Sequence, residues 1–253
     1  GTNLSGGSGV NLRGLGSGAT LTLINGRRVA QNGGTAGSFV DISSIPLSAV
    51  ERVEVLTDGA SAVYGSDAIA GVVNFVLRDD YEGMETTLRY GDTTQGGAEE
   101  FQASATAGKS WDTGNFLINY EFYQRDHLSK SQRPFTASLD LRPLGGDDFR
   151  INNAANPGTI IFPALAAIPA GQDGTALTPA DLQLGEQNVA DNARFADLLQ
   201  DQQRHSVYAM VRQGLSDKVE VFGEFRYAQR KSDYSQGSDI LTAQQVAANH
   251  PNY

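Results

Sequence analysis

Three glycines spaced six residues apart could form a phosphate-binding loop. They are Gly59, Gly65 and Gly71. Glycine-rich loops can cradle phosphates, but this segment lacks the Gly-Lys-Ser/Thr ending of a phosphate-binding loop and the glycine spacing of a dinucleotide-binding fold. We therefore interpret these glycines as residues that permit tight turns. Tyr64 has no lysine four residues later, so it does not form a tyrosine–lysine dehydrogenase pair.

The remaining reactive residue types indicate no catalytic centre. The sequence has no cysteine, which excludes disulfides, thiolate metal sites and thiol nucleophiles. The three histidines are dispersed, at His127, His205 and His250. None forms a pair with the spacing of zinc ligands, and we expect surface imidazoles. We therefore expect no enzymatic activity, no cofactor and no metal site.

Charge and hydropathy exclude two further classes. The net charge of the 253 residues is −10, whereas nucleic-acid binding requires clusters of lysine and arginine. Four loop acids, Asp147, Asp148, Asp181 and Asp191, could bind a cation, but solvated acids are the simpler interpretation. The longest apolar run, Thr159–Pro169, is shorter than the roughly 18 residues of a transmembrane helix and holds two prolines.

The first 80 residues predict a small α+β unit. A strand at Thr20–Ile24 precedes Asn25-Gly26, a strong hairpin-turn signal, and a partner strand at Arg27–Ala30. Ser43–Pro46 resembles a helix start, with Ser44 or Ile45 near the cap. The stretch Val50–Arg78 then holds two strands, Val50–Leu56 and Val72–Leu77, separated by a helical turn at Ala60–Tyr64.

From Met84 onward, five segments alternate apolar and polar residues with the period of a strand. They are Met84–Tyr90, Phe101–Ala107, Phe116–Tyr123, Ser206–Arg212 and Val219–Tyr227. Tight turns are expected at Ser110–Gly114 and Gly214–Lys218, and a long loop at His127–Arg204. Within the loop we expect short helices after Thr178-Pro179 and at Asp191–Gln202, and a further helix at Ile240–Asn249.

The alternation alone favours a soluble antiparallel sheet slightly over an outer-membrane barrel, and the loops and aromatic residues described next make the two interpretations about equal. Short turns that alternate with long loops favour the barrel. Aromatic residues near the strand ends favour it too, because aromatic girdles lie at bilayer interfaces. These residues are Tyr90, Tyr120, Phe122, Tyr123, Phe225 and Tyr227.

Five blocks in the first 80 residues resemble the TonB-dependent outer-membrane receptor family. They are Val10–Leu15, Leu21–Val29, Asp41–Pro46, Val50–Val55 and Ser61–Asn74. The resemblance implies a plug domain over residues 1–80 and the first strands and loops of a transmembrane β-barrel over residues 81–253. Barrels of this family have about 22 strands, so we expect an internal fragment with about five of them.

The resemblance also implies a function. Such receptors import a scarce ligand, such as a siderophore, cobalamin or a carbohydrate, across the Gram-negative outer membrane. Their partners are the TonB energy-coupling complex, outer-membrane lipid and the small-molecule ligand. An adhesin or structural barrel protein, and a soluble β-rich binding protein, remain alternatives at this point.

The family's plug and barrel meet through polar and charged contacts, which implies a set of candidate plug-motif and plug–barrel contact residues. They are Arg13, Gly14, Asn25, Gly26, Glu51, Arg52, Glu54, Tyr64, Gly65, Gly71, Asn74 and Arg78. Charges in a buried plug need partners, and these residues either stabilise the plug internally or hold it to the barrel as a latch. The ligand-binding residues are not evident from the sequence, although the loop His127–Arg204 is the best candidate region.

Overall fold

A computed structural model describes residues 6–31, 39–151, 155–161, 164–171 and 175–236. The chain divides into two compact units. The first holds residues 1–94, 98–126 and 200–233, and the second holds residues 95–97, 127–199 and 234–253. None of the helices in the described residues is long and apolar enough to cross a membrane.

A mixed four-stranded sheet forms the N-terminal part of the first unit, in the order β2-β1-β4-β3. Its strands are β1 (Thr20–Ile24), β2 (Arg27–Arg28), β3 (Val50–Leu56) and β4 (Gly71–Leu77). The β1–β2 turn is Asn25-Gly26, with φ of 49° and 74°, the positive values that a two-residue hairpin turn requires. The predicted strands are confirmed, although β2 is shorter than expected.

Short helices connect these strands. They are α1 (Ala60–Tyr64) and the 3-10 helices η1 (Leu12–Gly14), η2 (Ser17–Ala19), η3 (Ile42–Ser44), η4 (Leu47–Ala49) and η5 (Ser66–Ala68). The helical turn at Ala60–Tyr64 is confirmed. The predicted helix start is found as the single turn η4, but its N-cap is Pro46 instead of Ser44 or Ile45, because Ser44 ends a separate turn, η3, which Asp41 caps. Residues 6–31 and 39–80 together are called the plug below.

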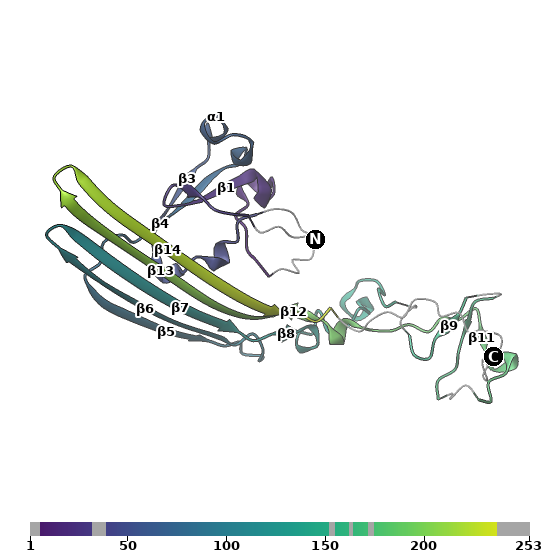
Figure 1. Cartoon of the computed structure of the whole chain (residues 1–253). Helices are drawn as coiled ribbons and strands as arrows, with labels where there is room; N and C mark the ends of the chain where they lie inside the picture. Colours follow the sequence, from purple (N-terminus) through teal and green to yellow (C-terminus); the bar gives the residue numbers. More distant parts are fainter. Residues whose placement is uncertain (1–5, 32–38, 152–154, 162–163, 172–174, 237–253) are drawn as a thin grey trace. The chain divides into compact units, whose positions relative to one another are not determined.

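Five long antiparallel strands, called the wall below, complete the first unit in the order β14-β13-β7-β6-β5. They are β5 (Gly83–Gly91), β6 (Glu100–Trp111), β7 (Gly114–Arg125), β13 (Asp201–Ser216) and β14 (Val219–Asp233). Figure 1 shows them side by side, with the plug against one of their faces. All five predicted strands and both tight turns are confirmed, and most strands are longer than their alternation indicated.

The second unit consists of short elements. Its strands are β8 (Leu128–Ser129), β9 (Thr159–Ile160), β10 (Ala166–Ala167), β11 (Gln183–Leu184) and β12 (Asp197–Leu199). Its 3-10 helices are η6 (Lys130–Gln132), η7 (Arg142–Leu144), η8 (Pro179–Asp181) and η9 (Ala193–Phe195). The helix predicted after Thr178 is confirmed as η8, which Thr178 and Asp181 close with a capping box.

The helix predicted over Asp191–Gln202 is wrong. This segment forms η9, then β12, which pairs with β8, and then the start of β13. An isolated helix of about twelve residues is only marginally stable. In this segment the backbone N–H and C=O groups of β12 and β13 form their hydrogen bonds with neighbouring strands instead. The helix predicted at Ile240–Asn249 lies outside the described residues.

Candidate functional site

The two faces of the wall carry opposite kinds of side chain. On β7, Asn115, Asn119 and Glu121 are buried toward the plug, whereas Phe116 and Ile118 are 39% and 48% exposed on the other face. A soluble half-buried sheet shows the reverse pattern, with apolar residues buried and polar residues in water. The inward, plug-facing side of the wall is therefore the polar one.

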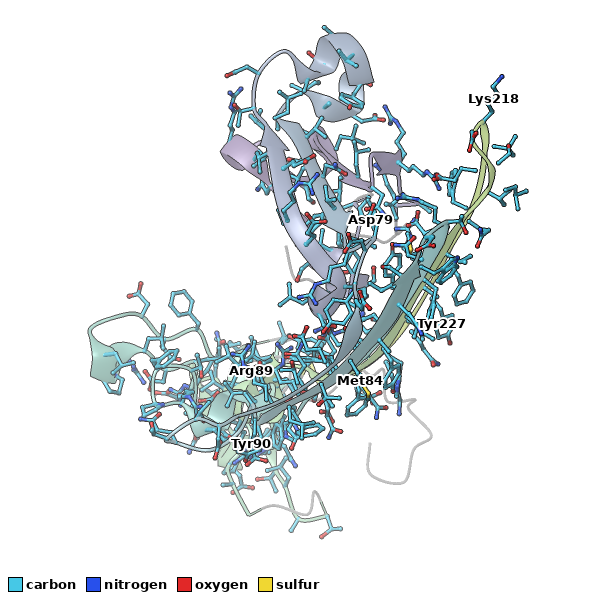
Figure 2. The ribbon with its side chains drawn as sticks, turned by 90° about the vertical axis from the view of Figure 1, so that its left-hand side faces the viewer. Asp79, Met84, Arg89, Tyr90, Lys218 and Tyr227 are labelled. Carbon is cyan, nitrogen blue, oxygen red and sulfur yellow. The ribbon has the colours of Figure 1, made fainter. Side chains whose placement is uncertain are left out.

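Of the six aromatic residues expected at the bilayer interfaces, all except Tyr123 lie on the outward face, which is the face opposite Asn119. Figure 2 shows Tyr90 and Tyr227 on the side of the wall away from the plug. Tyr123 was expected among the interfacial aromatics, but it points inward, where its hydroxyl donates to Glu100 at 3.0 Å and its ring lies 4.1 Å below the Arg204 guanidinium. Its inward position follows from the strand period of two, because its neighbour Phe122 faces outward.

A small apolar cluster lies at the centre of the contact between plug and wall. The plug contributes Ile24, Ile45, Ala49 and Leu77, and the wall contributes Leu117, Tyr208 and Met210. All seven residues are buried. The resemblance implied polar rather than apolar contacts here, and the structure contains both kinds.

A hydrogen-bonded network joins Ser48 of the plug to β7. The Ser48 backbone N–H and hydroxyl donate to Glu121 Oε2 at 3.0 and 2.9 Å. Asn119, which is 0% exposed, donates to the Ser48 hydroxyl at 2.9 Å and to Thr106 at 2.7 Å. Pro46, the N-cap residue of η4, has no side-chain cap, so Glu121 of the wall supplies the acceptor that the first turn of η4 lacks.

A second polar contact centres on Asp41. Its carboxylate accepts hydrogen bonds from the backbone N–H of Ser8 at 3.0 Å and of Ser43 at 3.1 Å, and it pairs with Arg230 of β14. Asp41 is 7% exposed and the Arg230 side chain 18% exposed. Arg204 of β13 donates to the Ser43 carbonyl at 2.7 Å. These groups line a cavity of about 360 Å³ between the plug and the wall.

A third polar contact surrounds Glu224 of β14. Asn25 donates to its carboxylate at 3.1 Å, and Arg27 lies 3.6 Å from it. On the neighbouring strand β13, Arg212 lies 3.4 Å from Asp79, which follows Arg78 and is labelled in Figure 2. All of these groups line a cavity of about 510 Å³.

Two of the candidate contact residues reach the wall in this structure. Asn25 contacts Glu224, and Arg78 pairs with Glu85 of β5 at 2.9 Å. A contact role for the candidate set stays a prediction, which uptake measurements on variants would test.

The other charged candidates contact the plug itself. Arg13 pairs with Asp58 at 2.7 Å, and Arg52 pairs with Glu51 at 2.8 Å and with Glu54 at 2.9 Å. The hydrogen bond from Arg13 lowers the pKa of Asp58. Hydrogen bonds from Asn74 and then Arg52 lower the pKa of Glu54.

The uncharged candidates shape the plug. The Asn74 side chain accepts from the Gly26 N–H at 2.9 Å, and the Tyr64 carbonyl accepts from Arg28 at 2.5 Å. Gly14 and Gly65 have φ of 70° and 83°. Gly71 has φ of 133°, and a Cβ there would lie 2.6 Å from the Leu56 carbonyl oxygen, so the close approach of β3 to β4 requires glycine.

Within the described part of the chain, the histidines and loop acids form no shared site. Among the described residues, no three His, Cys, Asp or Glu side chains are placed to hold a metal ion. His205 faces away from the plug and lies 2.8 Å from the Tyr120 hydroxyl, whereas His127 belongs to the second unit and His250 lies outside the described residues. Asp148 pairs with Arg150, Asp181 accepts from Thr178, and Asp191 accepts from Ser138.

Several contact residues were missed by the sequence reasoning: Asp41, Ser48, Glu121, Arg204, Glu224 and Arg230. Their common signal is a polar residue in a plug turn or at an inward position of a wall strand. The alternation identified the polar face but not the plug residue that each wall position meets.

Comparison with known proteins gives a family match for the plug and a likeness of fold for the plug and the wall. Residues 1–72 match the family model for the TonB-dependent Receptor Plug Domain. The fold resembles the ferric enterobactin receptor PfeA of Pseudomonas aeruginosa, solved as a mutant, with a TM-score of 0.56 and 15% identity over 92% of this chain. It also resembles the siderophore receptor PirA of Acinetobacter baumannii, with a TM-score of 0.54 and 14% identity over 89% of this chain.

The matched region covers only part of those receptors. The chain spans 28% of the PfeA chain and 26% of the PirA chain. At these identities the likeness concerns the fold, namely a plug domain followed by antiparallel strands.

Proposed function

We propose that this chain, which carries the plug domain of a TonB-dependent receptor, serves active import of a small-molecule ligand across a Gram-negative outer membrane. The wall strands would form part of a barrel, and the plug would close its lumen. One observation carries the proposal. The plug packs on the polar face of the wall, while the opposite face is apolar and exposed.

The exposed face has the composition of a surface that contacts lipid. Its exposed apolar side chains include Met84, Leu88, Tyr90, Phe116, Ile118, Tyr120, Val211, Val221, Phe225 and Tyr227. Transmembrane barrel strands alternate apolar residues toward lipid with polar residues toward the lumen. A soluble sheet would need another layer over this face, since an exposed apolar area of this kind is unfavourable in water.

The contacts between plug and wall suit a plug that closes the barrel lumen at rest and is displaced during import. Most are hydrogen bonds and ion pairs around one small apolar cluster. Polar contacts of this kind can be exchanged for contacts with water, so each hydrogen bond to a charged group contributes only about 1.5–3 kcal/mol net. The proposed pull by the TonB complex would therefore separate many weak contacts instead of one large apolar interface.

No covalent step belongs to this proposal. The energy comes from the inner-membrane complex, and ligand release requires that the pulled state bind the ligand less tightly than the resting state. The candidate ligands are a metal chelate such as a siderophore, cobalamin and a carbohydrate. A metal chelate ranks first, because the two similar receptors are described as receptors of siderophores or of ferric enterobactin.

Uptake in cells tests this function. The complete protein that contains this chain would be expressed in a Gram-negative host without its own receptors. Cells would be offered labelled ferric siderophores, cyanocobalamin and maltodextrins. We expect at least one to be imported, and import to stop when TonB is deleted or a protonophore collapses the proton-motive force. Import that continues without proton-motive force, or no import of any probe, would contradict the proposal.

A further inference from the structure

The cavity of about 360 Å³ between plug and wall combines two arginines with one carboxylate. Arg204 and Arg230 lie directly opposite each other on β13 and β14. Like charges at directly opposed positions destabilise a strand pair. Both guanidinium groups reach the same plug segment, where Arg230 pairs with Asp41 and Arg204 donates to the Ser43 carbonyl. Asp41 is the one carboxylate among the described residues that line this cavity, and it pairs with Arg230 and not with Arg204.

Arg204 is the less compensated of the two. Among the described residues, no carboxylate lies within ion-pair distance of it. Its guanidinium stacks 4.1 Å from the Tyr123 ring centre and has one neutral backbone acceptor. A cation removed from water without an opposite charge is costly, and this cost favours an additional anionic partner.

Arg125 supplies an independent observation on the same face. It lies opposite Gln202 on β13, two positions from Arg204. Its Nε is buried and has no hydrogen-bond acceptor among the described residues. Another nitrogen of the same guanidinium, Nη2, donates to the Gln200 carbonyl at 3.3 Å. Buried polar atoms are nearly always satisfied, so the unpaired Nε shows that the inward face near Arg204 is short of acceptors, although Arg125 itself is not among the residues that line the cavity.

The neighbouring carboxylates do not supply that acceptor. Glu121 accepts both hydrogen bonds from Ser48, and Glu100 accepts from the Tyr123 hydroxyl. Neither lies within ion-pair distance of Arg125, Arg204 or Arg230 in the described part of the chain. Asp41, which belongs to the plug and not to the wall, provides a carboxylate for Arg230, whereas Arg204 and Arg125 donate to the neutral carbonyls of Ser43 and Gln200.

We propose that this cavity binds an anionic group of the transported ligand, and that Asp41 occupies the position of that group in the resting plug. The ligand would carry carboxylate, phosphate or similar oxyanion groups, which match the planar donor fork of arginine. A lipid phosphate is not the intended occupant, because the cavity lies on the inward face of the wall. The inference rests on the proposed function and assigns a charge class to its ligand.

Displacement of Asp41 would also loosen the plug. The same carboxylate accepts the backbone N–H groups of Ser8 and Ser43, so it joins two plug segments to β14. A ligand anion that pairs with Arg230 in place of Asp41 replaces one ion pair with another. The Arg230 guanidinium therefore keeps an anionic partner throughout. Ligand binding would thereby favour a state in which the plug is less firmly attached.

Calorimetric titration of the complete purified receptor with citrate tests the site, with uncharged mannitol as the comparison. We expect citrate to bind and mannitol not to bind. Asp41→Asn keeps the hydrogen-bond acceptor for Ser43 but removes the competing charge, so citrate affinity should rise about tenfold. Arg204→Gln should lower it about tenfold. The matched control is Asp67→Asn, which removes an exposed plug carboxylate that pairs with Arg28, and it should leave citrate affinity unchanged.

Hydrogen exchange of peptide 39–45 gives a second measurement. Citrate should increase its exchange in the unaltered receptor and have a smaller effect in Arg204→Gln. Citrate binding that neither Asp41→Asn nor Arg204→Gln changes would overturn the inference, as would the absence of binding. If either variant fails to fold, the other variant and the hydrogen-exchange measurement still test whether citrate binds in this cavity. TonB-dependent import without an effect of Arg204→Gln would refute this site alone, whereas citrate binding without any import would refute the proposed function alone.

Discussion

The two faces of the wall have the same backbone but opposite surroundings. On β7, the alternate residues Asn119 and Ile118 differ completely in exposure, at 0% and 48%. The buried one is the amide and the exposed one is the hydrocarbon. In a soluble sheet this arrangement would cost free energy on both faces.

The difference shows that each face is matched to a different medium. The inward amide is satisfied by Ser48 and Thr106, so its burial leaves no group without a partner. The outward isoleucine is favourable if its surroundings are lipid. The interpretation of the whole wall therefore depends on what contacts the outward face, and the following predictions test each face in turn.

The largest effect is expected from a charge on the outward face. Ile118→Lys places an ammonium group in the middle of the apolar face, and a lysine near the bilayer midplane of a barrel costs about 2–4 kcal/mol. We expect a marked loss of the complete folded receptor in the outer membrane, measured from heat-modifiable mobility on gels. The control is Gln229→Lys, an outward position near the end of β14, where the cost should be near zero. Equal folded amounts of both variants would show that the outward face does not lie in lipid.

The second effect concerns the inward face. Asn119→Ala removes the partner of the Ser48 hydroxyl and of Thr106. Leaving buried polar groups unsatisfied costs about 1–3 kcal/mol. We expect faster hydrogen exchange of the peptide around Leu47–Ala49, while the barrel remains folded. Thr87→Ala, an exposed inward position on β5, is the control. Unchanged protection in Asn119→Ala would mean that this network does not hold the plug.

A smaller effect is expected where charges lie in water, in the second unit. Arg142 and Arg150 bridge Asp140 and Asp148. The hydrogen bond from Arg142 lowers the pKa of Asp140, and that from Arg150 lowers the pKa of Asp148. Because the folded pKa values are depressed, the contribution to stability is present above the usual aspartate pKa, about 3.9. It is lost as the pH falls through the folded values.

Hydrogen exchange of peptide 139–150, corrected for intrinsic rates, measures this loss. Protection should be constant from pH 7 to about pH 5 and should decrease below the usual aspartate range of about 3.9. Arg150→Gln should show reduced protection already at neutral pH. A protection profile that does not change with acid would indicate that these exposed pairs contribute nothing measurable.

The smallest effect on plug stability is expected for Arg52→Ala. Arg52 is exposed and pairs with two residues of its own strand, so its removal should not measurably change plug protection in hydrogen exchange. The latch hypothesis for Arg52 predicts in addition that uptake by the complete receptor changes. Altered uptake with unchanged plug protection would support a latch, and no change in either would refute it. Glu51→Gln, which removes one of the two partners, serves as the comparison.

The sequence predicted the local elements well, because their signals are local. A period of two identifies the wall strands, and Asn25-Gly26 can adopt the positive φ values that its turn requires. The segment Asp191–Gln202 misled the prediction for the same reason. Its helical spacing is a local signal, whereas β12 and β13 form through pairing with strands far away in the sequence.

The contact residues were harder to predict. Asp41 and Arg230 are separated by 189 positions, and Ser48 and Glu121 by 73. No spacing rule connects such pairs. Their proximity depends on the register of the wall strands and on the side of the plug that packs against them.

The sequence by itself determined the plug motif, the positions of the wall strands, and the existence of one polar and one apolar face, because turn chemistry and alternation act between near neighbours. Only the tertiary structure decided that the polar face is the buried one, and that Asp41, Ser48 and Asn25 are the plug residues that meet it. The physical reason is that a buried polar group needs a hydrogen-bond partner within reach. The packing of the plug on the wall determines which partner each inward polar group meets.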